Sequence, residues 1–267
     1  MTLIAQPLSD RHDIQPLRQR YVMGATAPLD GMWQCGLVPA STHTGLFHDD
    51  ALVGYYSIDA QNLVLQFHLD ASHRPRAADA FAALVDREKP DGAVVSTAEP
   101  DFLSLCLDHF PSFEVNALMY QHRGPAALEV ERLALEPLTS THLDEAVDFA
   151  HAALGAPAQW LREYYTGLLA REELFGTREH GRLIGLGESR GFQGLQPGYA
   201  DLGVIVAKTH RRRGLATRIL GSLAHMNAER DLRPLCSTEP TNTGARRAIE
   251  QAGFSARNRI VRFAAPK

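Results

Sequence analysis

The chain repeats one ordered set of landmarks, and this repeat restricts the possible folds more than any other feature of the sequence. The first half contains HLDASHRPRAADAFAALV and then AVVSTAEP, and the second contains VIVAKTHRRRGLATRILGSL and then RPLCSTEP. Ser96 follows His73 by 23 positions and Ser237 follows His210 by 27, a difference of about one helical turn. Each half therefore predicts a strand, a basic turn, an apolar helix and a second strand. We interpret the chain as two copies of one fold.

A segment with glycine, proline and alanine separates the two copies. It lies within YQHRGPAALEVERLALEP, residues 120–137, and interrupts the strand-like patterns on both sides. We therefore predict two domains, residues 1–124 and residues 125–267.

Apolar periodicity in the second copy predicts the element order ααβββαβαβ. Apolar residues that recur three and four positions apart predict helices in four segments: THLDEAVDFAHAAL, PAQWLREYYTGLLAR, LATRILGSLAHMNAER and NTGARRAIEQAGF. A hairpin that turns at Glu179–Gly181 is expected in ELFGTREHGRLIGLGESRGF, and further strands in YADLGVIVA, LRPLCSTE and ARNRIVRFAA. We expect an α+β fold class, in which each copy is a mixed, largely antiparallel sheet flanked by helices.

Composition argues against several classes of protein. The 267 residues include 27 Lys and Arg against 31 Asp and Glu, so no overall positive field attracts nucleic acid. No run of 18 apolar residues predicts a membrane span, and the first residues do not resemble a secretory signal. Three widely spaced cysteines favour a cytoplasmic location, and the histidines lack metal-ligand spacing. We expect no metal, membrane or nucleic-acid partner, while a monomer and a homodimer both remain open.

The stretch HRRRGLAT, residues 210–217, allows three interpretations: a solvated charge run, a nucleic-acid patch or a phosphate-binding loop. It follows a β-branched strand and starts a helix, where unpaired N–H groups and the helix dipole favour an anion. Arginines at this end oppose the dipole unless an anion is bound. Neither GxxxxGK[ST] nor GxGxxG occurs at such a turn. The pattern therefore favours a diphosphate site of another kind.

These residues resemble the acetyl-coenzyme A signature of the Gcn5-related N-acetyltransferase (GNAT) superfamily. Its pattern, Arg or Gln, two residues, Gly, one residue, then Gly or Ala, matches residues 211–216. A second block, NTGARRAIEQAGF, resembles the superfamily's later helix at Asn242, Ala245, Gly253 and Phe254. The resemblance covers about residues 128–263. It implies an N-acetyltransferase that transfers acetyl from acetyl-coenzyme A to a primary amine of a small molecule or peptide.

The resemblance also implies which residues hold the cofactor. Backbone N–H groups of one turn would bind the pyrophosphate, and this turn comprises Arg211, Arg212, Arg213, Gly214, Leu215, Ala216 and Thr217. Val204, Ile205 and Val206 would pair with the pantetheine arm like an added strand. Asn242 would lie along the same arm.

The reaction needs a base, because an amine with a pKa near 10 is almost fully protonated at pH 7. Glu188 on the third strand and Asp201 on the fourth are our candidates, and Glu239 is a third carboxylate nearby. The superfamily often carries a tyrosine as acid where this chain has Ile249, so water, the substrate or Ser237 must supply the proton. The alternative is a non-catalytic acyl-coenzyme A sensor or interaction module.

The first copy departs from the signature. Ala77 and Asp79 stand where the second copy has Gly214 and Ala216, and Pro75 lies inside the turn. We predict a degenerate copy that does not bind coenzyme A and serves as a structural partner or as a wall of the acceptor pocket. The rest of that pocket is expected from the segment 160–165 and the loop GFQGLQPGY, which includes Phe192, Gln193, Gln196 and Tyr199.

Overall fold

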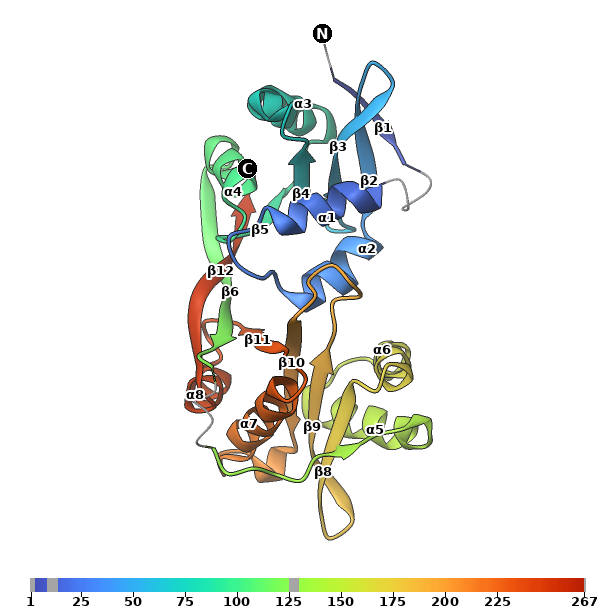
Figure 1. The fold of residues 1–267 in the computed structure, drawn as a ribbon, viewed down its shortest axis with the longest axis vertical. Coiled ribbons are helices and arrows are strands. Elements are labelled where there is room, and N and C mark those ends of the chain that lie inside the picture. Colours follow the sequence, from blue (N-terminus) through green and yellow to red (C-terminus); the bar gives the residue numbers. More distant parts are fainter. Residues whose placement is uncertain (1–2, 9–13, 125–129, 267) are drawn as a thin grey trace. The chain divides into compact units, whose positions relative to one another are not determined.

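The computed structural model describes residues 3–8, 14–124 and 130–266 (Figure 1). The chain forms two compact units. Unit 1 consists of Met1–Leu118, Gln193–Gln196 and Asn258–Lys267, and unit 2 of Met119–Phe192 and Pro197–Arg257. The predicted domain boundary falls at the edge of residues 125–129, which lie outside the described residues, and it stays a prediction.

Unit 1 is built on the first copy of the repeat. Its elements are β1 (Ile4–Pro7), α1 (Gln15–Met23), η2 (Trp33–Leu37), α2 (Val38–Ala40), β2 (Thr42–His48), β3 (Ala51–Ile58), β4 (Leu63–Leu69), η3 (Arg74–Arg76), α3 (Ala77–Glu88), β5 (Gly92–Ser96), α4 (Pro100–His109), most of β6 (Ser112–His122) and the last part of β12 (Phe254–Ala264). The strand order runs β1-β2-β3-β4-β5-β12-β6. From β1 to β12 along this order, neighbouring strands are antiparallel except β4 and β5.

Two adjacent tyrosines on β3 show how the helices of unit 1 are distributed. Tyr55 packs against Leu17 of α1. Tyr56 belongs to a larger cluster that includes Phe81 of α3 and Phe102 of α4. Because successive strand residues point to opposite faces, α1 covers one face of the sheet and α3 and α4 cover the other.

The strand beside β5 comes from the end of the chain. Residues 260–264 of β12 pair antiparallel with β5, and the Arg259 N–H donates to Thr97 Oγ1 at 3.0 Å. Phe263 is only 1% exposed and lies in the core cluster of unit 1, where its ring centroid is 6.2 Å from that of Phe110. The last strand of the second copy therefore completes the sheet of the first unit.

Unit 2 carries the second copy. Its elements are the end of β6, then β7 (Glu136–Pro137), η5 (Ser140–His142), α5 (Leu143–Leu154), α6 (Ala158–Ala170), β8 (Leu174–Glu179), β9 (Arg182–Arg190), β10 (Tyr199–Val206), η6 (Lys208–His210), α7 (Leu215–Ala228), β11 (Arg233–Thr238), α8 (Thr243–Gln251) and the start of β12. The strand order runs β6-β11-β10-β9-β8-β7. β7 to β10 are antiparallel neighbours, whereas β10 and β11 are parallel.

Alternation along β9 places the helices of unit 2 on opposite faces of its sheet. Leu186 packs into the cluster formed by α5 and α6. Gly185 and Gly187 flank it, and a Cβ at either position would lie within 3 Å of Ile219 on α7. Small residues on that side therefore let α7 approach the sheet closely.

The predicted α+β class and the order ααβββαβαβ of the second copy are confirmed. The order of strand, basic turn, helix and strand is also found in both units, as β4-α3-β5 and β10-α7-β11. Two elements were not predicted from the sequence. One is β7, which has only two residues, and the other is α4 of unit 1, which corresponds to α8 of unit 2. In the part of the chain that the structure describes, no helix has the length and apolar character of a membrane span.

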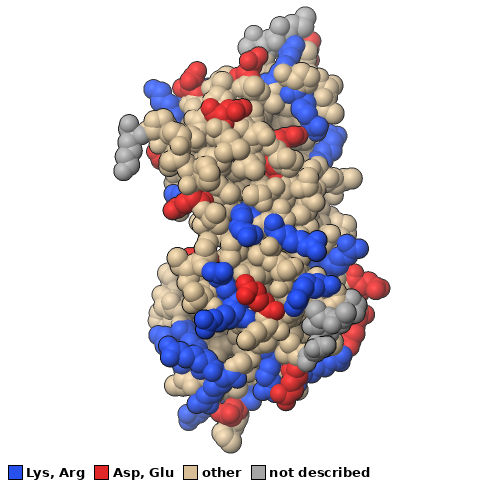
Figure 2. Space-filling view, turned by 90° about the vertical axis from the view of Figure 1, so that its left-hand side faces the viewer, with Lys and Arg blue, Asp and Glu red and all other residues tan. Residues whose placement is uncertain are grey.

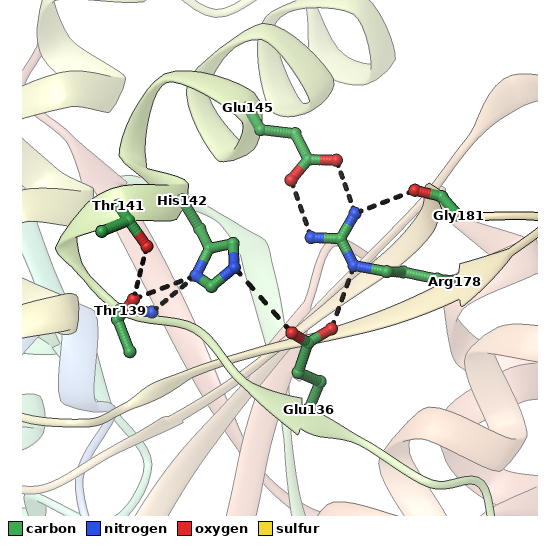
Figure 3. Close-up of polar contacts among 7 residues, drawn as sticks. All are labelled: Glu136, Thr139, Thr141, His142, Glu145, Arg178 and Gly181. Atoms are coloured by element: carbon green, nitrogen blue, oxygen red, sulfur yellow. Dashed lines mark hydrogen bonds and ion pairs between the residues drawn. The ribbon is translucent and has the colours of Figure 1, made fainter.

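Arg178 on β8 joins three elements of unit 2 (Figure 3). Its Nη1 and Nη2 atoms donate to the two carboxylate oxygens of Glu145 on α5, at 2.6 and 2.7 Å. Its Nε donates to Glu136 on β7 at 2.9 Å, and Glu136 also faces His142 Nε2 at 3.8 Å. The hydrogen bonds from Arg178 lower the pKa of Glu145. This network ties β7 and the start of α5 to β8, which is a structural role.

We expect Phe263→Ala to lower the free energy of unfolding of unit 1 by about 3 kcal/mol, because it leaves a cavity in the core of that unit. The chain has two tryptophans, Trp33 in unit 1 and Trp160 in unit 2. Urea unfolding followed by fluorescence in a Trp160→Phe background therefore reports unit 1. Leu107→Ala, at a position 53% exposed on α4, is the control and should change little. An unchanged transition for Phe263→Ala would contradict the role of the chain end in this core.

Candidate active site

The parallel pair β10 and β11 separates part-way along β10. The two strands pair over residues 199–201 and 233–235, and no further register is formed between them in the described chain. On its other side β10 stays paired with β9 through Val206. Val204, Ile205 and Val206 thus present one edge without a strand partner, and all three are half-buried. Backbone N–H and C=O groups at such an edge can accept an extended amide-bearing ligand.

The turn after β10 leads to the N-terminus of α7 through two left-handed residues. Arg212 has φ +63° and Gly214 has φ +74°. The first helical hydrogen bond runs from the Arg218 N–H to the Gly214 carbonyl, so the N–H groups of Leu215, Ala216 and Thr217 precede it. A Cβ built on Gly214 would meet no atom within 4 Å. Glycine is therefore favoured here by its backbone conformation, and space lies open beside it.

The three arginines of this turn differ in what their side chains do. Arg211 donates from Nη2 to the Ala153 carbonyl at 2.9 Å and from Nε to the Val206 carbonyl at 3.3 Å, which ties the turn to α5 and β10. Arg212 and Arg213 are exposed. Figure 2 shows one face of the molecule, on which Lys and Arg side chains gather over the surface of unit 2. All three arginines are exposed and contribute positive charge at the turn, and the side chain of Arg211 also supports the turn itself.

The other predicted cofactor residues lie on α7 and α8. Asn242 is the exposed N-cap of α8, and its side-chain oxygen accepts the Ala245 N–H at 3.1 Å. Its amide nitrogen keeps two donor hydrogens for other partners. Thr217 Oγ1 donates to Gln251 Oε1 at 3.4 Å, which joins α7 to α8.

The two predicted catalytic carboxylates are brought together by an arginine. Arg190 Nη2 donates to Asp201 Oδ2 at 2.7 Å, and Nη1 donates to Glu188 Oε2 at 3.1 Å. The Tyr164 hydroxyl donates to the same Glu188 oxygen at 2.7 Å. Asp201 is 1% exposed and Glu188 is 6% exposed. The result is a buried group of one cation, two carboxylates and one phenol at the place where β10 and β11 separate.

Burial controls the protonation of this group. Desolvation lowers the pKa of Arg190, but Asp201 and Glu188 outweigh it, so that the pKa lies above its usual value. Burial and the neighbouring Glu188 raise the pKa of Tyr164, which keeps its hydroxyl protonated. Gly203 faces Glu188 across the β9–β10 ladder, and a Cβ there would lie 2.8 Å from Glu188 Oε2. The absence of a side chain at this position thus leaves the carboxylate its space.

The turn in unit 1 that corresponds to residues 210–216 has a different conformation. Its residues form η3 and continue directly into α3, with φ of −97° at Arg76 and −60° at Ala77. Pro75 stands within this short helix. Without a left-handed residue, the turn does not present its N–H groups as the turn in unit 2 does.

Two expected residues of the acceptor pocket are buried. Gln196 is 7% exposed and belongs to unit 1, where its amide oxygen accepts the Leu29 N–H at 2.7 Å and its amide nitrogen donates to the Leu29 carbonyl. Phe192 belongs to unit 2 and is 3% exposed. Their place in an acceptor pocket stays a prediction. Trp160 is 48% exposed and stacks on Tyr164 with ring centroids 5.2 Å apart, so the aromatic part of α6 remains accessible.

Comparison with known proteins decides the family. Residues 10–123 match the family model described as an acetyltransferase (GNAT) domain, and residues 135–254 match that of the acetyltransferase (GNAT) family. A solved acetyltransferase of the GNAT family from Colwellia psychrerythraea is 36% identical, with a TM-score of 0.93 over 98% of this chain and 100% of that chain. The chain belongs to the GNAT acetyltransferase family.

Two more distant structures share the tandem fold of this GNAT protein. A tandem GNAT protein from the clavulanic acid biosynthesis pathway is 15% identical, with a TM-score of 0.69 and full coverage of both chains. A GCN5-related N-acetyltransferase from Sphaerobacter thermophilus is 14% identical, with a TM-score of 0.67 over 97% of this chain and 94% of that chain. No curated protein matches the sequence. The expected family and the tandem arrangement of two GNAT domains are confirmed.

The sequence-based expectation for this GNAT protein did not include Arg190, and it included Tyr164 only as part of the segment 160–165 and not as a partner of Glu188. Arg190 stands two positions after Glu188 and therefore on the same face of β9, a spacing that could have indicated an ion pair. Tyr164 is brought to Glu188 by the packing of α6, and its position in the sequence carries no such signal.

We expect Asp201→Asn to lower the free energy of unfolding of unit 2 by about 2 kcal/mol, because the buried Arg190 loses one of its two carboxylates. The double variant Asp201→Asn/Arg190→Met should lose less than the sum of the two single variants, since no uncompensated cation is then buried. Urea unfolding at pH 7 measures both. Asp144→Asn is the control, because it breaks an exposed ion pair with Arg162 and should cost at most about 0.5 kcal/mol. If the loss of unfolding free energy in the double variant equalled the sum of the losses in the two single variants, the predicted coupling between Asp201 and Arg190 would be wrong.

Proposed function

We propose that unit 2 is an N-acetyltransferase that moves an acetyl group from acetyl-coenzyme A to a primary amine of a small molecule or peptide. One observation carries this proposal: the unpartnered edge of β10 leads directly into a left-handed turn at the N-terminus of α7. An extended amide chain fits the edge, and a diphosphate fits the turn. Pantetheine and the pyrophosphate of coenzyme A have these two chemistries in the same order.

In this proposal the cofactor is held mainly by backbone groups. The edge of Val204–Val206 pairs with the amides of the pantetheine arm, and the Asn242 amide lies along the same arm. The N–H groups of residues 211–217 receive the pyrophosphate, while the exposed side chains of Arg212 and Arg213 add positive charge. Arg211 contributes through its backbone, because its side chain is bonded to Ala153 and Val206.

The chemistry requires a neutral amine. At pH 7 almost every alkylamine is protonated, so a proton must leave before nitrogen can attack. We propose that Glu188 accepts it through a water molecule, and that Asp201 acts as a positioning residue through Arg190. The nitrogen then forms a bond to the thioester carbonyl carbon and loses its second proton, the carbon–sulfur bond breaks, and the thiolate of coenzyme A takes up one proton, so that one proton is released to solvent overall. The products are an N-acetyl amine and coenzyme A.

A second candidate is an acyl-coenzyme A-binding module without catalysis. Ile249, at the position where the family often has a tyrosine acid, is 4% exposed and has an apolar side chain. It cannot protonate a leaving thiolate. In the enzymatic proposal this proton comes from water or the substrate, or from Ser237 on β11, whereas the binding module releases no thiol.

Gly214→Glu should weaken coenzyme A binding at least tenfold, because a carboxylate beside a diphosphate repels it. Isothermal calorimetry measures the affinity. Gly181→Glu is the matched control: Gly181, at the tip of the β8–β9 hairpin, has φ +78°, and its Cβ would likewise meet no atom within 4 Å. Both variants thus carry the same backbone strain and the same added charge. No binding of coenzyme A by the unaltered protein, or equal affinities in the two variants, would contradict the proposed cofactor site.

Glu188→Gln should lower kcat about 100-fold and leave the affinity for coenzyme A unchanged, because it removes only the proton acceptor. A panel of primary amines with detection of released coenzyme A thiol measures the rate. Glu229→Gln, at an exposed position just after α7, is the control and should retain full activity. Coenzyme A binding without thiol release from any amine would favour the non-catalytic module.

A further inference from the structure

A small pocket opens in unit 1 where β4 and β5 separate. These parallel strands pair only through Leu63–Gly92 and Val64–Ala93, and beyond this point the pocket lies between α1 on one side and α3 and α4 on the other. Its volume is about 70 Å³. At roughly 10–15 Å³ for each enclosed water, it holds about five water molecules. A ligand group with about five non-hydrogen atoms therefore fits.

A carboxylate lines this pocket because the turn before α4 differs between the two copies. The turn STAEP, residues 96–100, has one residue more than STEP, residues 237–240. The extra residue, Ala98, is fully buried, and its carbonyl accepts the Thr26 N–H just after α1. Glu99 lines the pocket, whereas Glu239 in unit 2 is exposed. Protein atoms surround the Glu99 carboxyl group, yet part of its surface stays accessible.

The charges around the pocket leave Glu99 without a cation. Its Oε1 accepts the Tyr21 hydroxyl proton, and its Oε2 accepts the Ser96 N–H at 2.5 Å. Within the described ranges no Lys, Arg or His forms an ion pair with Glu99. The two arginines that line the pocket face other carboxylates: Arg20 Nε is 3.0 Å from Asp70, and Arg74 Nε is 3.3 Å from Asp101. A positive charge in the ligand would compensate Glu99.

Two further groups near Glu99 can accept hydrogen bonds from a cation. Burial lowers the pKa of His68 to about 4, so the imidazole is neutral and accepts a hydrogen bond at one of its two ring nitrogens. Its Nε2 makes no hydrogen bond to the described residues and lies 4.0 Å from Asp70 Oδ1. The Tyr21 oxygen, which donates its proton to Glu99, keeps its acceptor capacity. The rings of Tyr21 and His68 lie edge to face with centroids 5.9 Å apart, and both line the pocket. Three acceptors match the three donors of an ammonium group.

Apolar side chains form the rest of the wall. Phe67 and Leu69 of β4 and Phe102 and Leu105 of α4 line the pocket. These side chains suit a short alkyl stem, and the aromatic rings also favour a nearby cation.

We propose that unit 1 carries a second small-molecule site, separate from the proposed acetyl transfer in unit 2, which binds a primary alkylammonium group of three or four carbons. The carboxylate of Glu99 pairs with the ammonium group, Tyr21 and His68 accept its remaining hydrogen bonds, and the apolar wall holds the alkyl stem. The degenerate copy then has a ligand of its own.

Calorimetric titration of the full chain with n-propylamine hydrochloride tests this site. Burial raises the pKa of Glu99 to about 7, against the lowering effect of the hydrogen bonds from Tyr21 and Ser96. At pH 6 the carboxyl group is mostly protonated, and an ammonium ion would ionise it. Binding should release about one proton at pH 6 and almost none at pH 8.5, measured as the difference between two buffers of unequal ionisation enthalpy.

Other titratable groups face Glu99, and a variant separates their contribution. Burial raises the pKa of Tyr21 and that of Cys106, and both stay protonated in this range. Any proton exchanged by His68, Arg20, Arg74 or Asp101 should appear equally in Glu99→Gln, whereas the release at pH 6 should vanish in that variant.

Glu99→Gln should also weaken propylamine binding roughly tenfold or more, because a charge-assisted hydrogen bond is lost. Glu114→Gln, at an exposed glutamate of β6 in unit 1, should bind normally. Trp33 fluorescence in a Trp160→Phe background verifies that unit 1 stays folded in each variant. Propionate and 1-propanol, which have similar size but no positive charge, should not bind. Binding of propionate, absence of saturable binding, or unchanged affinity in Glu99→Gln each overturns the proposal.

Discussion

The separation of two parallel strands is the constraint on which the candidate sites depend. In unit 2 the pairing of β10 with β11 ends at Asp201, and from there the unpaired edge of β10 leads to the turn before α7, while Arg190 binds Asp201 where the strands separate. In unit 1 the pairing of β4 with β5 ends even earlier, and the opening there holds Glu99. A sheet that closed fully between these strands would satisfy its own backbone groups and leave no place for a ligand. The same strand separation thus underlies both of the sites that we propose.

The difference between the two openings follows from a few residues. In unit 2 a glycine with positive φ exposes the amide groups of a helix N-terminus, and these attract an anion. In unit 1 a short helix that contains Pro75 replaces this turn. The turn before α4 has one additional residue, Ala98, and the carboxylate of the next residue, Glu99, lines the pocket. The two proposed sites therefore favour ligands of opposite charge.

Much of the architecture could be predicted from the sequence, because apolar periodicity and the repeated landmarks act locally. The helices and strands of the second copy and the hairpin at Glu179–Gly181 were predicted in this way, whereas the family followed from the resemblance of residues 211–216 and 242–254 to the GNAT motifs. The pairing of Arg190 with both Glu188 and Asp201 was not, since it depends on the register of β9 and β10 and on the packing of α6. The assignment of Gln196 to unit 1 was not predicted either, because a loop that passes from one unit to the other has no periodic pattern of apolar residues. The sequence could not predict contacts between residues that meet only in the tertiary structure.

The course of β12 has a consequence for how the protein is made. On the ribosome the chain emerges from its N-terminus, and domains generally fold in that order. Unit 1 lacks the strand beside β5 until residues 258–267 have left the ribosome, so the edge of β5 stays uncovered while the second copy is being made. The first copy to be translated is therefore completed only after the second, and a chain that still lacks these residues carries an exposed strand edge that can recruit other chains.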